Sequence, residues 1–120
     1  MGHIHTRARG TAAEKVAAEF LESKGYDIVD RNFYTRFGEI DLVVRDSEGV
    51  FAFVEVKYRA KNIDGGGFAS ITERKLSTIR LVSGIWLSTH RDDYEEIDNI
   101  RIDVIDVGPG GVRDHLEGVW

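Results

Sequence analysis

Charged residues interrupt two apolar runs of this sequence. Residues 38–44 read GEIDLVV and contain Asp41, and residues 51–57 read FAFVEVK and contain Glu55 and Lys57. Aspartate is depleted in β-strands, and burying a carboxylate without a partner costs free energy. Glu55 and Lys57 are two residues apart, so they share one face of a strand. Acids in strands otherwise built for burial are candidates for chemistry.

The turn between the two runs decides whether the acids meet. If Ser47-Glu48-Gly49 is a three-residue loop with Gly49 in the left-handed conformation, paired residue numbers add up to 96. Asp41 then lies opposite Glu55, with Cβ atoms roughly 5 Å apart. A two- or four-residue loop would place the acids on opposite faces. The site hypothesis therefore depends on this turn.

Two adjacent carboxylates suit a divalent cation, and an all-oxygen site favours Mg²⁺ or Mn²⁺ over zinc. In phosphodiester hydrolysis such a metal activates water and polarises the phosphate, and Lys57 could orient the nucleophile or stabilise negative charge. Glu14, at the border of an apolar helical stripe, could reach the same face, or it could be solvated or paired within its helix. The alternative for the strand residues is a buried salt bridge of one lysine with two acids.

Periodic patterns predict the elements that must position these residues. The predicted helices are 11–24 and 70–90, and the predicted strands are 26–30, 39–46, 50–59 and 100–107. Gly25 would end the first helix, and Ser70 with Glu73 would form a capping box for the second. The order α-β-β-β-α-β predicts an α/β or α+β domain with a mixed central sheet flanked by helices.

Length and composition predict one domain. The chain has 120 residues, 42% of them hydrophobic, and no cysteine, which excludes disulfides and thiol chemistry. Residues 1–9 are expected to be flexible, residues 60–67 to form a glycine-rich flexible loop, and residues 108–120 to form a tail that could be helical. Without an apolar stretch of 18 residues or an export signal, we expect a cytoplasmic protein.

The net charge of −5 argues at first against a nucleic-acid partner. Lys and Arg number 16, against 21 Asp and Glu. However, residues 1–61 contain ten bases and ten acids, and the whole acid excess lies in residues 62–120. The charge balance is therefore compatible with weak or transient contact to DNA near the two acids.

Basic and aromatic residues surround the proposed site in sequence. The basic residues are Arg31, Arg36, Arg45, Arg59 and Lys61, and the aromatic ones are Phe33, Tyr34 and Tyr58. They could form a phosphate-contacting surface with stacking groups, or they could be solubility charges and core aromatics. Lys75, in the second helix, could contact a phosphate or complement nearby acids.

The spacing of Asp41, Glu55 and Lys57 resembles a known sequence signature. Asp41, thirteen intervening residues and then Glu55-Val56-Lys57 resemble the PD-(D/E)xK nuclease signature without its proline. More closely, the chain resembles the small bacterial YraN-like family over about residues 7–107. The resembling stretches are residues 10–14, Arg31-Asn32, residues 38–42, residues 53–59, Lys75 and residues 101–104.

The resemblance implies a fold similar to Holliday-junction resolvases and restriction-endonuclease cores. It implies a metal-dependent nuclease acting on DNA, including branched or structured DNA, and a possible homodimer. Asp41 and Glu55 match its metal-binding acids, with the carbonyl of Val56 as a further ligand to Mg²⁺ or Mn²⁺. Lys57 matches the catalytic lysine, and Glu14 matches the helix acid of resolvase-type members. Two alternatives are a non-catalytic nucleic-acid-binding or DNA-repair-associated module with the same fold, and a protein-binding domain.

Overall fold

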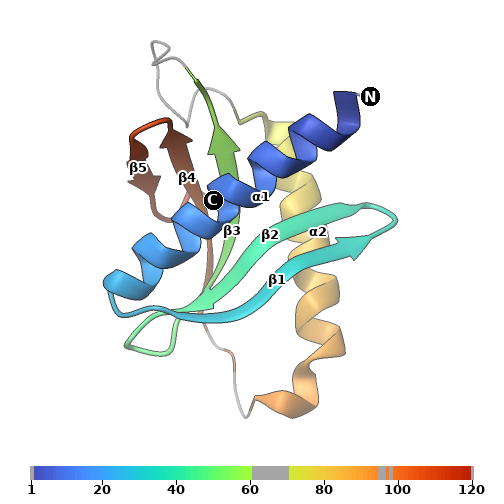
Figure 1. The fold of residues 1–120 in the computed structure, drawn as a ribbon. Coiled ribbons are helices and arrows are strands. Elements are labelled where there is room, and N and C mark those ends of the chain that lie inside the picture. Colours follow the sequence, from blue (N-terminus) through green and yellow to red (C-terminus); the bar gives the residue numbers. More distant parts are fainter. Residues whose placement is uncertain (1, 61–70, 95–96, 98, 120) are drawn as a thin grey trace.

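A five-stranded mixed sheet with a helix on each face forms the molecule (Figure 1). The computed structural model describes residues 2–60, 71–94, 97 and 99–119, with the backbone alone for residues 2–10 and 91. The helices are α1 (Gly2–Ser23), α2 (Glu73–Thr89) and the short 3₁₀ helix η2 (Arg91–Asp93). The strands are β1 (Asp27–Thr35), β2 (Gly38–Arg45), β3 (Phe51–Tyr58), β4 (Ile100–Gly108) and β5 (Gly111–Leu116). They lie in sequence order, with β3 and β4 parallel and the other pairs antiparallel.

The predicted order of elements and the mixed sheet are confirmed, with three differences at the ends. Helix α1 begins at Gly2 instead of Thr11, and β1 continues to Thr35 because it pairs with β2 up to Gly38. The expectation of a helical tail is wrong, because β5 pairs with β4 across a tight turn and Val112 packs against the core. The predicted cap Ser70 and the glycine-rich loop lie outside the described residues. The N-cap of α2 is Thr72, whose side chain accepts a hydrogen bond from the Lys75 N–H.

The turn between β2 and β3 has the predicted length. Every described pair of these strands, from Leu42 with Val54 to Arg45 with Phe51, has residue numbers that add up to 96. Gly49 has a φ of +86°, and its N–H donates to the Asp46 carbonyl at 3.0 Å. The Asp46 carboxylate also accepts from the N–H of Val50 at 2.9 Å. The predicted register is therefore confirmed.

Both faces of the sheet are buried under a helix. Helix α1 covers an apolar layer formed by Ala13, Ala17, Leu21, Leu42, Val44, Ala52, Val54 and Ile105. Helix α2 covers a second layer formed by Ile40, Val43, Phe51, Phe53, Ile79, Val82, Trp86 and Ile102. The two central acids thus belong to strands that lie inside the molecule. In the described part of the chain, neither long helix is apolar enough over a sufficient length to cross a membrane.

The β1–β2 hairpin packs closely against α2. A Cβ atom added to Gly38 would lie 2.7 Å from Cγ2 of Thr78 and 3.8 Å from Cγ2 of Val82. Gly38 also has a φ of +155°, which side chains rarely adopt. Glycine is therefore required twice at this position, for backbone conformation and for space.

Replacing Gly38 with alanine should destabilise the protein. We expect Gly38→Ala to lower the free energy of unfolding by about 1–3 kcal/mol, because the new methyl group displaces the hairpin from α2. Gly84→Ala is the matched control, since Gly84 lies in α2 with no atom within 4 Å of an added Cβ. It should stabilise the helix by roughly 0.5–1 kcal/mol. Urea denaturation measures both, and a Gly38→Ala protein as stable as the wild type would contradict the packing argument.

Candidate functional site

Asp41 and Glu55 lie where β2 and β3 leave their regular ladder. The described pairing ends at Leu42 with Val54, and the same register carried one residue further sets Asp41 opposite Glu55. Each of the two acids is only 6% exposed. Like charges directly opposite each other on one face destabilise a sheet unless a positive charge offsets them. The sheet thus holds two acids at a position that calls for a cation.

The main chain of β3 holds the Asp41 carboxylate in place. The Val56 N–H donates to Oδ2 of Asp41 at 2.7 Å. In an unbroken ladder this N–H would donate to the backbone of Ile40, so the Asp41 side chain takes the place of a carbonyl. The N–H and C=O of one strand residue face the same neighbouring strand. The Val56 carbonyl therefore also faces the side of β2 that carries Asp41.

Two lysines converge on a single oxygen of Glu55. Nζ of Lys57 lies 3.4 Å from Oε1 of Glu55, and Nζ of Lys75, from the first turns of α2, lies 3.6 Å from it. The lysine side chains are 30% and 37% exposed, so both reach solvent. The structure thus brings the predicted Lys57 to Glu55. Lys75 complements a nearby acid, Glu55, which is the second of the two roles considered for it above.

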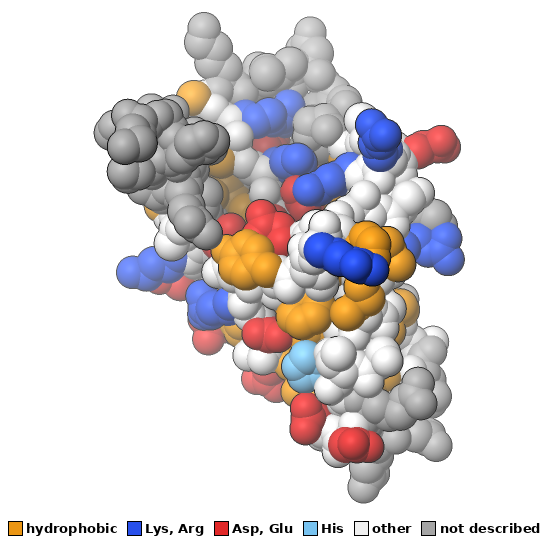
Figure 2. All heavy atoms as spheres, turned by 90° about the vertical axis from the view of Figure 1, so that its right-hand side faces the viewer, with side chains coloured by type: hydrophobic (Ala, Val, Ile, Leu, Met, Phe, Trp, Pro, Cys, Tyr) orange, Lys and Arg blue, Asp and Glu red, His pale blue; other side chains and the backbone are white. Residues whose placement is uncertain are grey.

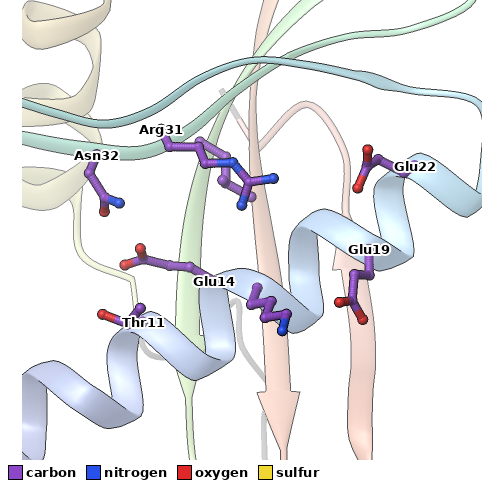
Figure 3. A pocket seen from close by; sticks show the side chains of 8 residues that line it. Thr11, Glu14, Glu19, Glu22, Arg31 and Asn32 are labelled. Atoms are coloured by element: carbon purple, nitrogen blue, oxygen red, sulfur yellow. The ribbon is translucent and has the colours of Figure 1, made fainter.

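Glu14 approaches the same acids from α1. Figure 3 shows its side chain pointing from the helix into the space beside Asn32 of β1. Its pKa is raised by burial first and by the charge of Glu39 next, while a hydrogen bond from Asn32 lowers it and the Glu55 charge raises it further. Glu39 was not among the predicted site residues. Its position two residues before Asp41, on the same strand, was the signal that could have identified it.

Burial and neighbouring charge raise the pKa of Asp41 from 3.8 to about 7. Desolvation is the largest cause, followed by the charge of Glu55, with Glu14 and Glu39 adding smaller increases. The hydrogen bond from Val56 acts in the opposite direction. A cation beside the carboxylates would favour the charged form of Asp41 and reverse this shift.

The donors fit magnesium better than a metal that needs many protein ligands. Within the described residues, no group of three or more His, Cys, Asp or Glu side chains forms a ready metal site. Asp41 and Glu55 with the Val56 carbonyl supply three oxygen donors. Mg²⁺ is usually bound by one or two carboxylates and keeps several waters. The residues present therefore fit a hydrated Mg²⁺ or Mn²⁺ ion.

A pocket opens beside Glu14 on the α1 side of the sheet (Figure 3). Its lining residues are Thr11, Glu14, Lys15, Glu19, Glu22, Arg31, Asn32 and Leu42. Asp41 and Glu55 do not line it, so the pocket lies next to the two central acids and does not enclose them. Of Glu14, Glu39, Asp41 and Glu55, whose charges affect one another, Glu14 is the one that lines the pocket.

The predicted nucleic-acid contacts lie in different surroundings. Arg36 is exposed in the β1–β2 turn, with its guanidinium carbon 4.7 Å from the centre of the Phe37 ring. Arg59 is paired with Asp106 of β4 at 2.8 Å and its side chain is 14% exposed. Asp106 raises the pKa of this arginine. Lys61 lies outside the described residues. Arg36 is thus exposed to solvent, whereas Arg59 forms an ion pair with Asp106 of the sheet.

The charge on Asp41 should reduce stability as pH rises. The folded state binds a proton at Asp41 more tightly than the unfolded chain, so stability is lost between about pH 4 and pH 7. Asp41→Asn keeps an acceptor for Val56 and removes the charge. Without metal, we expect this variant to be more stable than the wild type at pH 8 by roughly 2 kcal/mol, with the difference shrinking towards pH 4. Urea denaturation across this pH range tests the expectation.

Asp106→Asn is the control for this pH series. Asp106 is equally buried, at 2% exposure, but it is paired with Arg59. Breaking that pair should destabilise the protein at every pH in the range. If Asp41→Asn behaves in the same way, Asp41 is a structural acid and the argument for a cation is wrong.

The matches among solved structures include two weak likenesses. The chain in the EndoMS–dsDNA2 complex is 20% identical with a TM-score of 0.34, over 67% of this chain and 27% of that chain. Pyrococcus furiosus SfsA in complex with Ca²⁺ is 16% identical with a TM-score of 0.36, over 93% of this chain and 63% of that one.

Sequence comparison gives a much stronger result. A UPF0102 protein of Rhodopseudomonas palustris is 40% identical over 111 residues, which cover 92% of this chain and 82% of the relative. One from Corynebacterium efficiens is 42% identical over 113 residues, covering 92% and 89%. The model of the "Uncharacterised protein family UPF0102" matches residues 13–107, a range that includes Glu14, Asp41, Glu55 and Lys57. The chain therefore belongs to the UPF0102 family.

Proposed function

We propose that this protein is a metal-dependent nuclease that hydrolyses phosphodiester bonds of DNA, with branched or structured DNA among its substrates. The observation that carries the proposal is the pair of buried carboxylates, Asp41 and Glu55, on neighbouring strands just beyond their last described pair, with two lysines beside Glu55. Carboxylates with a neighbouring lysine are groups that metal-assisted phosphodiester hydrolysis can use.

Asp41, Glu55 and the Val56 carbonyl would hold Mg²⁺ or Mn²⁺. When bound, such an ion supplies a more acidic water and a polarised phosphate oxygen. The raised pKa of Asp41 supports this assignment, because the carboxylate is buried first of all and lies beside the charge of Glu55, and a cation would offset both effects. The hydrogen bond from Val56 supports it as well, since it keeps the Asp41 carboxylate in one orientation.

The lysines and Glu14 have separate tasks in this proposal. Lys57 is partly exposed and held 3.4 Å from Glu55, so it can turn to a phosphate oxygen or to the attacking water. Lys75 stays beside Glu55 and limits the repulsion between the acids. Glu14, whose pKa is raised, borders the pocket and can accept a proton from a water there. Arg36 is the exposed cation proposed to contact the nucleic-acid backbone.

A non-catalytic nucleic-acid-binding or repair-associated module is the second candidate. One observation favours it: Lys57 and Lys75 together offset the charge of Glu55 without any metal. The same cluster could then serve only to attract and orient a phosphate backbone. Metal binding and strand cleavage separate the two candidates.

Metal binding should depend on both central acids. In calorimetric titrations with MnCl₂, we expect Asp41→Asn and Glu55→Gln each to weaken binding at least about tenfold, because each removes one of two charged ligands. Glu48→Gln is the control, since Glu48 is exposed in the turn at the other end of the same strands. Unchanged binding in both site variants, with folded protein, would refute the metal assignment.

Cleavage should depend on Lys57. With labelled linear, flapped and four-way DNA, we expect metal-dependent cleavage that Lys57→Ala reduces at least about 100-fold, through lost stabilisation of developing charge. Lys24→Ala is the control, because Lys24 follows α1 at its far end and lies 3.8 Å from Glu117. Binding of these substrates without cleavage of any of them would favour the non-catalytic module.

A further inference from the structure

The tip of the β1–β2 hairpin presents two aromatic rings and a guanidinium to solvent. Tyr34 is 59% exposed and Phe37 is 48% exposed, and they are the two most exposed large aromatic side chains of the described residues. Arg36, also exposed, lies over one face of the Phe37 ring. In Figure 1 the hairpin reaches past α2, so its tip stands clear of the sheet. We call Tyr34, Arg36 and Phe37 the tip cluster.

Local hydrogen bonds and packing hold the tip in one conformation. Oγ1 of Thr35 donates to the Gly38 carbonyl at 2.9 Å and accepts from the N–H of Phe37 and of Gly38, at 3.1 and 3.2 Å. A Cβ atom added to Gly38 would lie 2.7 Å from Cγ2 of Thr78, so the turn has little space to move towards α2. The exposed rings are therefore carried by a fixed turn, which lowers the entropy lost when they bind a partner.

The chemistry of the tip cluster favours nucleobases as its partner. Aromatic rings and arginine planes are stacking surfaces for unpaired bases, and arginine adds attraction to phosphate. A peptide partner would be favoured by a concave apolar groove, whereas these rings stand on a projecting turn. Figure 2 shows hydrophobic side chains in the middle of this face, with Lys and Arg side chains above and to either side of them and Asp and Glu side chains beside and below them. Bases in the middle, with phosphates along the upper border where Lys and Arg gather, match that arrangement.

The tip cluster lies on the same hairpin as Asp41. Tyr34 pairs with Glu39, and Glu39 precedes Asp41 by two residues on β2. At about 3.3 Å per strand residue, Tyr34 is roughly 7 Å and Phe37 roughly 13 Å along the hairpin from the level of Asp41. A strand whose phosphate lies at the acids can thus place bases a few nucleotides away on the tip.

We propose that the tip cluster stacks on unpaired bases of a nucleic-acid strand, so that the substrate class of this site is single-stranded DNA or the single-stranded portion of a fork or flap. The inference rests on the proposed function in placing the strand's phosphates at Asp41 and Glu55. It adds the recognition element: the protein selects unpaired bases through Tyr34 and Phe37, and Arg36 contributes both its plane and its charge.

Binding without metal tests the tip cluster independently of cleavage. Fluorescence anisotropy in EDTA at low salt compares three labelled probes: a poly-dT oligonucleotide, an abasic oligonucleotide of equal length and a blunt duplex. We expect the wild type to bind poly-dT more tightly than the abasic strand. The double variant Tyr34→Ala/Phe37→Ala should weaken poly-dT binding about tenfold or more and leave the other two probes within about twofold.

Ile100→Ala is the matched control. Ile100 is 46% exposed at the start of β4, opposite Phe51 and thus at the end of the sheet away from the acids. It should bind all three probes like the wild type. Tyr34→Trp adds a spectroscopic readout, because its fluorescence should be quenched by poly-dT and not by the abasic strand. Urea denaturation of each variant verifies that it is folded.

Three results would overturn the proposal. An equal loss of affinity for poly-dT and the abasic strand would show that the tip acts through charge or structure, and an unchanged affinity for poly-dT would show that it has no role. If no probe binds to the wild type even at low salt, the surface belongs to a protein partner. Intact base-dependent binding without cleavage under any metal condition would refute the nuclease and leave the tip cluster standing.

Discussion

The three-residue turn between β2 and β3 determines where every side chain of the two central strands points. Because side chains alternate along a strand, a turn longer or shorter by one residue would move each apolar side chain of one strand to the other helix. The left-handed conformation of Gly49 and the hydrogen bonds to Asp46 set this length. The same register, carried one residue past its last described pair, sets Asp41 opposite Glu55, so the apolar layers and the acidic pair depend on one local geometry.

Repulsion between Asp41 and Glu55 destabilises the sheet that contains them. Helices α1 and α2 bury the surrounding strands, and this burial keeps Asp41 away from water. The protein offsets part of the repulsion with two lysines at Glu55 and one main-chain N–H at Asp41. Charged groups kept in such surroundings are common at functional sites, where stability is lost in exchange for reactivity.

Local patterns were sufficient to predict the strands of the hairpin, its register and the position of Lys57 beside Glu55. These features depend on alternation and on one turn, which a sequence shows directly. Features set by distant contacts were harder to predict. Arg59 donates a hydrogen bond to Asp106, which lies 47 residues later in the sequence. The two residues are neighbours because β3 pairs in parallel with β4. Strand β5 forms because it pairs with the free edge of β4. The sequence of the short polar tail gives little indication of this pairing.

Helix α2 lies against both Glu55 of the acidic pair and the hairpin that carries the tip cluster. Lys75 contacts Glu55, and Thr78, three residues later on the same face, contacts the hairpin at Gly38. A shift of this one helical turn would move the second lysine and the hairpin tip together. The residues of this turn are therefore expected to vary during evolution in step with both regions, so that a change tolerated at one must also be tolerated at the other.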